Sequence, residues 1–434
     1  MTKREDLIAR RTSAVARGVS TRGIYAVRAE NAELWDADGK RYLDFASGIA
    51  VNNTGHRHPT VMAAVAEQAL AFTHTCFNVA PFEGYLTLAE ELNRIAPGDF
   101  EKKTMLVTTG AEAVENAIKM ARAFTGRSGI IAFSGAFHGR TLMGMALTGK
   151  VVPYKKGFGP MPAEVVHAPF PNAFHGVSEA ESLAAIDRIF ASNIDPERVA
   201  AIIVEPVQGE GGFNIAPYTW LRALRTICDK HGILLISDEI QAGMGRTGVM
   251  FGIQHAGVVP DLVTMAKGLA GGFPLSAVTG RADVVDAPNV GGLGGTYAGN
   301  PIAVAAANAV LQVIKDEDLC ARATEIGNRI RPFLENLANR QGMEPIGNVR
   351  GLGAMNAFEL VKNRQTNDGD APLTNAIVAE AEHRGLILLS CGTRANVIRL
   401  LPPLTIPFGQ LDEALGILEA SVEAAIQTTA TNAA

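Results

Sequence analysis

The stretch GILLISDEIQ, residues 232–241, decides the fold of this 434-residue chain. It begins with a short, uninterrupted apolar run, and such runs are typical of parallel strands that are buried on both faces. Because a parallel sheet needs helices on its faces, the run predicts an α/β fold. The strand ends at Asp238, and ligands of open α/β sheets bind beyond the carboxyl ends of the strands. Asp238 is therefore a candidate site residue, although a carboxylate that caps the next helix is an equally good interpretation of this residue alone.

A second strand end lies 29 positions further on, at Lys267. The strand DLVTMA, residues 261–266, leads directly into the small, apolar, glycine-rich turn KGLAGG. Burial in such a turn disfavours the ammonium form and frees the amine to attack a carbonyl carbon, as a Schiff-base lysine must. A lysine taken at random is far more often a solvated surface residue. The functional interpretation is favoured here because two neighbouring strand ends present an acid and an amine to one crevice.

Two glycine-containing segments predict contacts with a phosphate group. In the first, Thr109, Gly110 and Ala111 begin a helix directly after the apolar run at 105–107. The N–H groups and the positive dipole end at a helix start bind phosphate well. The second is the loop GGLGGTYAGN, residues 291–300, where Thr296 offers a hydroxyl and an N–H. Each segment alone is also compatible with an ordinary capped helix or a flexible loop.

Strand and helix patterns alternate through the middle of the chain, with apolar runs at 130–133, 200–204, 233–236 and 262–265. This alternation predicts a largely parallel sheet covered by helices. From about residue 316 on, short strand patterns at 353–359, 386–389 and 397–400 mix with helical ones. They predict a smaller α+β part that also takes in the N-terminus.

Longer motifs resemble the class III pyridoxal-phosphate-dependent aminotransferases, which have fold type I. They are ASGIAVNNTGH at 46–56, GAFHGRT at 135–141, VEPVQGEGG at 204–212, and DEIQAGMGRTG at 238–248 followed by Lys267. The resemblance covers essentially the whole chain. It implies a large cofactor-binding domain, residues 58–315, with a mostly parallel seven-stranded sheet between helices. It also implies a small α+β domain built from both termini, residues 1–57 and 316–434.

The resemblance assigns roles around the cofactor, pyridoxal 5'-phosphate. It implies that Lys267 forms a Schiff base with the cofactor and moves the proton in the reaction, while Asp238 pairs with the pyridinium nitrogen. The remaining cofactor contacts that it implies are the stacking ring of Phe137, His138 beside it, Gln241 near the phenolic oxygen, and the N–H groups of Gly110 and Ala111 on the phosphate.

The resemblance further implies that Thr296 reaches the phosphate of the neighbouring subunit's cofactor. The enzyme is therefore expected to be an obligate homodimer with shared active sites. Pairing of dimers into tetramers stays open at this point.

Within the class, the motifs are most similar to those of enzymes that transfer the amino group of 4-aminobutyrate to 2-oxoglutarate. This implies that Arg140 binds the carboxylate far from the reacting amine, and that Arg399 binds the α-carboxylate of glutamate. Because 4-aminobutyrate has one carboxylate, it leaves Arg399 without a ligand, and an unpaired buried charge is costly. We expect Glu205 to pair with Arg399 in that state and to release it for glutamate.

The predicted substrate site also includes Glu210, from the VEPVQGEGG motif, and Ile49, as an apolar wall beside the substrate chain. Packing in the core is an equally good interpretation of Ile49. Aminotransferases for 5-aminovalerate, ornithine or N-acetylornithine share nearly every motif, because the length of the substrate depends on pocket depth. An aminomutase, a decarboxylating transaminase and a non-enzymatic protein with the same fold are alternatives from other classes.

Composition and charge restrict the possible partners. The net charge of −5 gives no general attraction to nucleic acid or to an anionic membrane. No apolar stretch approaches the roughly 18 residues of a membrane span. Four cysteines lie far apart without a CxxC pair, which predicts reduced thiols and a cytoplasmic protein. His56 and His58 have no cysteine or acid beside them, so we expect no metal site.

Overall fold

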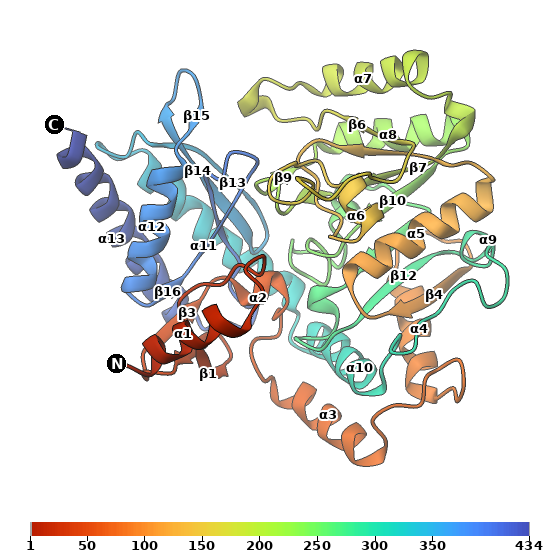
Figure 1. Cartoon of the computed structure of the whole chain (residues 1–434), viewed down its shortest axis with the longest axis horizontal. Coiled ribbons are helices and arrows are strands. Elements are labelled where there is room, and N and C mark those ends of the chain that lie inside the picture. Colours follow the sequence, from red (N-terminus) through yellow and green to blue (C-terminus); the bar gives the residue numbers. More distant parts are fainter. Residues whose placement is uncertain (1, 434) are drawn as a thin grey trace.

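The computed structural model describes residues 2–433, which form a large part and a smaller part, and the smaller one holds both ends of the chain (Figure 1). The large part is built on a seven-stranded sheet of order β4–β12–β11–β10–β7–β5–β6. Its strands are β4 (Lys102–Val107), β5 (Gly129–Phe133), β6 (Val165–Ala168), β7 (Val199–Val204), β10 (Leu234–Asp238), β11 (Leu262–Met265) and β12 (Ser276–Arg281).

The direction of the strands confirms the predicted, mostly parallel sheet. The pairs β11–β10, β10–β7, β7–β5 and β5–β6 are parallel. β12 is antiparallel to both of its neighbours, β11 and β4, so β4 runs in the same direction as the parallel strands. The carboxyl ends of all strands except β12 therefore meet at one edge of the sheet.

The sequence patterns did not predict β6 or β12. The sequence of β12, SAVTGR, mixes small and polar residues without a long apolar run. Its register pairs Ser276 with Val107, the last residue of β4. The start of β12 and the turn before it, residues 272–275, therefore lie at the same edge as the carboxyl ends of the parallel strands.

Helices bury both faces of the sheet. α5 (Gly110–Thr125) packs on β11 and β12, α8 (Tyr218–His231) on β10, and α7 (Glu179–Ser192) and α6 (Leu142–Leu147) on β6. Alternate residues of β7 and β10 enter different core clusters: Ile203 and Ile236 pack with α5, whereas Ile202 and Leu235 pack with Trp220 of α8. Burial on both faces explains why these strands are continuous apolar runs. The remaining helices of the large part are α3 (Pro59–Ala71), α4 (Glu83–Ile95), α9 (Ala282–Val285) and α10 (Pro301–Asp316).

The smaller part joins the two ends of the chain. β1 (Ala26–Glu30), β2 (Glu33–Asp36) and β3 (Arg41–Asp44) form an antiparallel meander, and β3 pairs in parallel with β16 (Leu386–Ile387). This pairing confirms that the N-terminus belongs with the C-terminal α+β part, while the exact boundaries at residues 57 and 315 stay predictions. A second sheet contains β13 (Ile346–Leu352), β14 (Met355–Asn363), β17 (Leu389–Cys391), β18 (Val397–Leu400) and, at the edge of β14, β15 (Asp368–Gly369). The helices are α1 (Lys3–Ala14), the short α2 (Ser47–Ala50), α11 (Leu319–Ala338), α12 (Ala371–His383) and α13 (Phe408–Ala433).

Candidate active site

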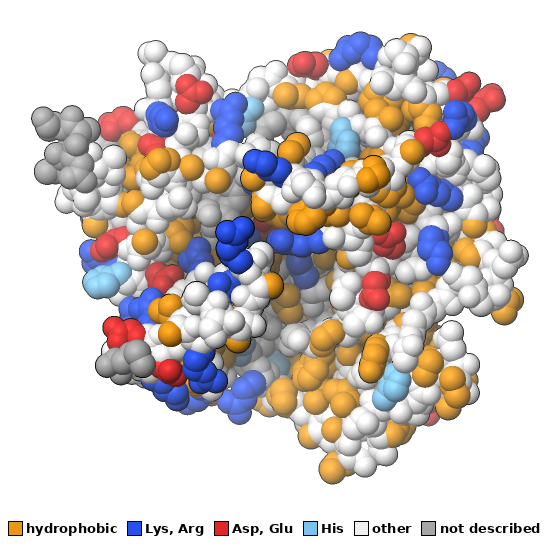
Figure 2. All heavy atoms as spheres, viewed as in Figure 1, with side chains coloured by type: hydrophobic (Ala, Val, Ile, Leu, Met, Phe, Trp, Pro, Cys, Tyr) orange, Lys and Arg blue, Asp and Glu red, His pale blue; other side chains and the backbone are white. Residues whose placement is uncertain are grey.

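A cavity of about 480 Å³ lies at the edge of the large sheet where the parallel strands end. Five of these strands contribute to its lining: Gly110 follows β4, Phe137 follows β5, Glu205 follows β7, Asp238 ends β10 and Lys267 follows β11. The sequence prediction that the acid and the amine share one crevice is therefore confirmed. Figure 2 shows lysine and arginine side chains gathered around a hollow near the middle of the molecule.

Asp238 is held by neighbours on several sides. One carboxylate oxygen, Oδ1, accepts hydrogen bonds from the hydroxyl of Thr264 (3.1 Å) and the N–H of Ile240 (3.2 Å). The other, Oδ2, lies 2.7 Å from Nδ1 of His138. Burial lowers the pKa of His138, but its hydrogen bond with Asp238 and the charges of Asp238 and Glu205 outweigh burial and raise that pKa. Asp238 and His138 thus form a hydrogen-bonded pair inside the cavity.

Lys267 has the environment that a nucleophilic amine needs. It begins the short turn η4 (Lys267–Leu269) with a φ of +46°, a backbone conformation that costs a non-glycine residue energy and is concentrated at functional sites. Burial lowers the pKa of its amine; the nearby charges of Glu210 and Asp238 oppose this shift, and that of Arg399 adds to it. The lowered pKa increases the share of neutral, reactive amine.

The start of α5 forms a cradle at the other end of the cavity. Thr109 caps the helix, and its partner in a reciprocal capping box is Glu112. The N–H groups of Gly110 and Ala111 remain without a hydrogen-bond acceptor among residues 2–433. A β-carbon on Gly110 would lie 2.9 Å from Cδ1 of Ile240, so glycine lets this end stay open without a shift of the Ile240 side chain. The cradle suits a phosphate group.

The residues between the cradle and the lysine fit pyridoxal phosphate. Phe137 presents an aromatic ring to the cavity and packs on Tyr154, with ring centroids 4.9 Å apart. Oε1 of Gln241 and Nε2 of His138 are buried and have no hydrogen-bond partner among the described residues. Unsatisfied buried polar atoms are rare in native proteins, and a bound polar ligand is one explanation for them.

The substrate side corrects one sequence-based prediction: Arg399 pairs with Glu210, not with Glu205. Nη1 and Nη2 of Arg399 face the two carboxylate oxygens of Glu210. Burial raises the pKa of Glu210, but the charge and hydrogen bond of Arg399 outweigh burial and lower it. Sequence motifs place both glutamates near the site but do not show which of them faces the strand that carries Arg399.

Glu205 is bound by backbone instead. Its carboxylate accepts hydrogen bonds from the N–H groups of Phe137 (2.9 Å) and Gly209 (3.0 Å). Burial raises the pKa of Glu205 to about 7. Glu205 therefore holds together the loop that contains Phe137 and the loop that contains Gly209. Because its carboxylate is engaged there, the ion-pair partner of Arg399 is Glu210.

Arg140 lies at the cavity wall, and Tyr154 contacts residues that line the cavity. Arg140 is exposed, lines the cavity and stacks over the ring of Tyr154, 5.0 Å from the centroid. The hydroxyl of Tyr154 lies 3.5 Å from Oε2 of Glu210. Sequence reasoning missed Tyr154, because an isolated tyrosine in the loop at 150–160 has no motif that marks it.

Ile49 and Thr296 lie outside the lining of this cavity. Ile49 is 42% exposed, and it is Val51, two residues further along, that lines the cavity. Thr296 is exposed on the loop before α10. Their predicted contacts with substrate and with a second subunit's cofactor stay predictions.

The described residues show neither a metal site nor a membrane-spanning helix. No cluster of three or more histidine, cysteine, aspartate or glutamate side chains there is arranged to hold a metal ion. His56 and His58 instead pair with Asp44 and Glu317, each at 2.9 Å. None of the described helices is long and apolar enough to cross a bilayer.

Comparisons with known proteins agree with this geometry. The family model for class III aminotransferases matches residues 14–422. A 5-aminovalerate aminotransferase of Pseudomonas aeruginosa is 54% identical over 95% of this chain and 97% of the relative. The 4-aminobutyrate aminotransferase of Escherichia coli is 53% identical over 98% of this chain and 100% of the relative.

Solved structures of similar proteins have the same fold. A taurine:2-oxoglutarate aminotransferase from Bifidobacterium kashiwanohense, in complex with PLP and glutamate, has a TM-score of 0.90 at 31% identity, over 98% of this chain and 99% of that one. An ornithine aminotransferase from Toxoplasma gondii has a TM-score of 0.87 at 30% identity, over 99% of this chain and 96% of that one.

Proposed function

Because the chain belongs to the class III aminotransferase family, whose members depend on pyridoxal phosphate, we propose that it transfers the amino group of 4-aminobutyrate to 2-oxoglutarate, giving succinate semialdehyde and glutamate. The observation that carries this proposal is the buried pair of Arg399 and Glu210 beside the cavity. A buried arginine with its own carboxylate accepts an amine substrate that has one carboxylate without leaving a charge unpaired. It accepts a dicarboxylate substrate by exchanging partners.

The protein's own residues divide the work of amino transfer. When bound, pyridoxal phosphate supplies an aldehyde that takes up the amino group and a pyridinium ring that withdraws electrons. Nζ of Lys267 would take the proton from the amine-bearing carbon of the substrate and deliver it to the carbon that carried the cofactor's aldehyde. The carboxylate of Asp238 keeps the ring nitrogen protonated, and His138 orients that carboxylate. The N–H groups of Gly110 and Ala111 hold the phosphate.

Two arginines bind the carboxylates of the substrates. Arg140, at the exposed wall, binds the carboxylate far from the reacting amine, and it does so for both substrates. Arg399 binds the α-carboxylate of glutamate or 2-oxoglutarate after the Glu210 side chain has moved away. With 4-aminobutyrate, Arg399 stays paired with Glu210. The exchange lets one cavity serve substrates with one and with two carboxylates.

5-Aminovalerate is a second candidate amine, because one of the most similar relatives is named for it. It differs from 4-aminobutyrate by one methylene, and a hydrophobic pocket discriminates one methylene by only about 1–3 kcal/mol. The enzyme is therefore expected to accept both amines at different rates.

A half-reaction titration of the purified enzyme tests the proposed function. Amines are added singly (β-alanine, 4-aminobutyrate, 5-aminovalerate, ornithine, N-acetylornithine), and the visible spectrum of the cofactor is followed before and after addition of 2-oxoglutarate. Fast bleaching by 4-aminobutyrate that 2-oxoglutarate reverses is the expected result. A spectrum that responds only to ornithine-type amines contradicts the proposed substrate, and a protein that binds no cofactor contradicts the proposed function as a whole.

We also propose that the enzyme is a cytoplasmic homodimer with shared sites. Large apolar side chains are exposed on the segment of α3 and α4 and near Thr296: Leu70 (90%), Val79 (79%), Leu86 (52%), Val290 (108%) and Tyr297 (65%). Exposure of many such side chains marks an interaction surface. We propose that a second copy of the chain covers this surface, because Thr296 is predicted to contact the phosphate of the neighbouring subunit's cofactor. The four cysteines are free thiols, as expected of a reducing compartment.

Thr296→Ala tests the shared site. Loss of one hydrogen bond to a charged phosphate is expected to weaken cofactor binding about 10-fold to 100-fold, while the sedimentation coefficient stays that of a dimer. Thr226→Ala, an exposed threonine on α8, is the control and should bind the cofactor like the unaltered enzyme. Equal cofactor affinity of both variants would show that Thr296 does not reach the phosphate.

A further inference from the structure

The loop that carries Glu210 is held by its backbone at every residue from 210 to 212. This loop, residues 209–212, lies in the connection between β8 (Val207–Gln208) and β9 (Asn214–Ile215). The carbonyl of Glu210 accepts a hydrogen bond from the N–H of Gly392 (3.0 Å) and the carbonyl of Gly211 one from the Asn214 side chain (3.1 Å). The carbonyl of Gly212 accepts one from Nε of Arg350 (2.8 Å). Gly392 and Arg350 belong to the smaller part, so this loop spans the two parts.

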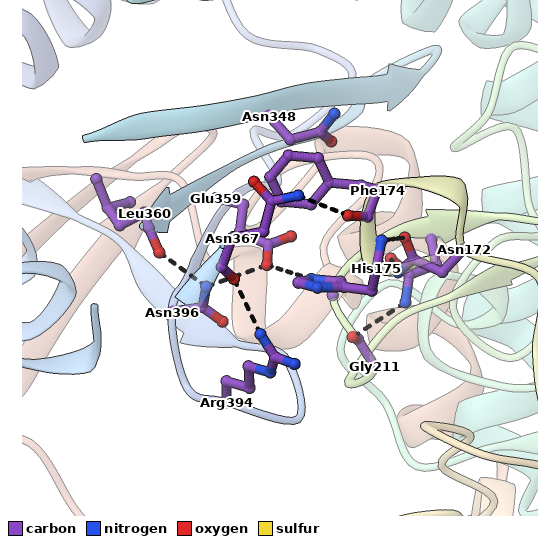
Figure 3. A network of polar contacts seen from close by, with 12 residues as sticks. Asn172, Phe174, His175, Gly211, Asn348, Glu359, Leu360, Asn367, Arg394 and Asn396 are labelled. Atoms are coloured by element: carbon purple, nitrogen blue, oxygen red, sulfur yellow. Dashed lines mark hydrogen bonds and ion pairs between the residues drawn. The ribbon is translucent and has the colours of Figure 1, made fainter. Parts of the chain in front are cut away.

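Arg350 is itself fixed by a buried carboxylate. Its Nη1 lies 2.8 Å from Oε2 of Glu359, a β14 residue that is 2% exposed. The other oxygen of Glu359, Oε1, accepts hydrogen bonds from Nε2 of His175 (2.7 Å) and from the Asn396 amide (3.1 Å). Figure 3 shows His175 and Asn396 approaching Glu359 from different sides. Burial raises the pKa of Glu359, but the charges of Arg350 and His175 and these hydrogen bonds outweigh burial and lower it.

The same sheet presents both Arg399 and Glu359. In the register of β14 and β18, Ala357 pairs with Arg399 and Glu359 pairs with Val397. Because residues two apart on a strand point to the same face, Arg399 and Glu359 project from one face of this sheet. The arginine that binds the Glu210 side chain and the carboxylate that fixes Arg350 are therefore carried by the same sheet.

We propose that Glu359, Arg350 and His175, here called the Glu359 clamp, are positioning residues that keep the 209–212 loop in place while Arg399 exchanges its partner. Only the side chain of Glu210 moves in this exchange, and its backbone stays ready to bring the carboxylate back. A preorganised loop avoids the entropic cost of ordering a segment in every turnover. The clamp rests on the proposed function, because it acts on the exchange between substrates with one and two carboxylates.

The two half-reactions depend on the clamp to different degrees. With 4-aminobutyrate, Arg399 relies on Glu210 for its counter-charge, so a loose loop leaves this arginine poorly paired. With glutamate, the substrate's own α-carboxylate pairs with Arg399, and the position of Glu210 matters little. A loosened clamp therefore lowers the rate with the amine that has one carboxylate, whereas general damage to the fold lowers both rates.

Glu359→Gln and Arg350→Lys test the clamp in the holoenzyme. The first change puts an uncharged amide opposite Arg350. The second change keeps a positive charge opposite Glu359 but removes the Nε–H group that donates a hydrogen bond to the carbonyl of Gly212. Each change is expected to lower kcat/KM of the 4-aminobutyrate half-reaction about tenfold and to leave the glutamate half-reaction within about twofold. Asn367→Gly is the matched control: it removes a hydrogen bond to the carbonyl of Phe174, next to His175, without touching Glu359 or the loop.

Two further measurements separate the possible outcomes. If the clamp acts through Glu210, Glu359→Gln has no further effect on the 4-aminobutyrate half-reaction in a Glu210→Gln background. Hydrogen exchange of the peptide that contains residues 208–213 should be faster in Glu359→Gln and unchanged in Asn367→Gly, independently of activity. The clamp would be contradicted by additive losses of kcat/KM in the double variant, by equal losses in the two half-reactions, or by unchanged hydrogen exchange of residues 208–213. None of these results would contradict the proposed function. An unaltered enzyme that reacts with no monocarboxylate amine overturns the proposed function and the clamp with it.

Discussion

Lys267→Ala is expected to lower the rate of amino transfer more than about 10⁴-fold, because positioned general acid–base catalysis alone contributes about 10²–10⁴-fold and the Schiff-base nucleophile is lost as well. Among the residues that line the cavity, Lys267 is the lysine, and its lowered pKa suits it to attack an aldehyde. The measurement is a single-turnover reaction with 4-aminobutyrate, together with the visible spectrum of the variant after addition of pyridoxal phosphate.

The fold of Lys267→Ala should survive, since the change removes a desolvated amine rather than a core contact. A thermal unfolding midpoint at or above that of the unaltered enzyme is expected. Lys230→Ala, an exposed position near the end of α8, is the control and should keep full activity. Activity of Lys267→Ala within tenfold of the control would show that another group is the nucleophile.

Glu210→Gln is expected to lower kcat/KM of the 4-aminobutyrate half-reaction by about 10²-fold, since breaking a buried ion pair costs about 3–5 kcal/mol and screening at the cavity wall reduces that loss. Arg399 is 4% exposed and would face only an uncharged amide when the substrate has one carboxylate. The glutamate half-reaction should change little, because the substrate supplies the missing charge. Both half-reactions can be followed by stopped-flow absorbance of the cofactor.

The same measurement on Glu205→Gln distinguishes the two glutamates. Glu205 contacts the backbone of Phe137 and Gly209, so its replacement should affect both half-reactions to a similar extent. If Glu205→Gln instead caused the selective loss and Glu210→Gln did not, the pairing seen in the structure would not be the one that operates during turnover.

The large sheet could be predicted from particular runs. The apolar stretches that became β5, β7, β10 and β11 are long enough, and buried enough on both faces, to be recognised without any partner. The antiparallel β12 was missed, because SAVTGR has no apolar periodicity and is a strand only through its pairing with β4 and β11. A strand with a long apolar run can be predicted from its own sequence. A strand such as β12, which forms because it pairs with β4 and β11, can be recognised only in the folded sheet.

The sequence by itself determined the α/β class, the meeting of Asp238 and Lys267 at adjacent strand ends, and the helix start at Gly110 that lines the same cavity. Each follows from residues that are close along the chain or from the shared direction of parallel strands. The partner of Arg399 was decided only by the tertiary structure. Glu205 and Glu210 differ by five positions, yet one faces the backbone of the large part and the other faces β18 of the smaller part. The hydrogen bonds that turn the 209–212 loop toward Arg399 come from Gly392 and Arg350, more than a hundred residues further along the chain, and no local pattern encodes such a contact.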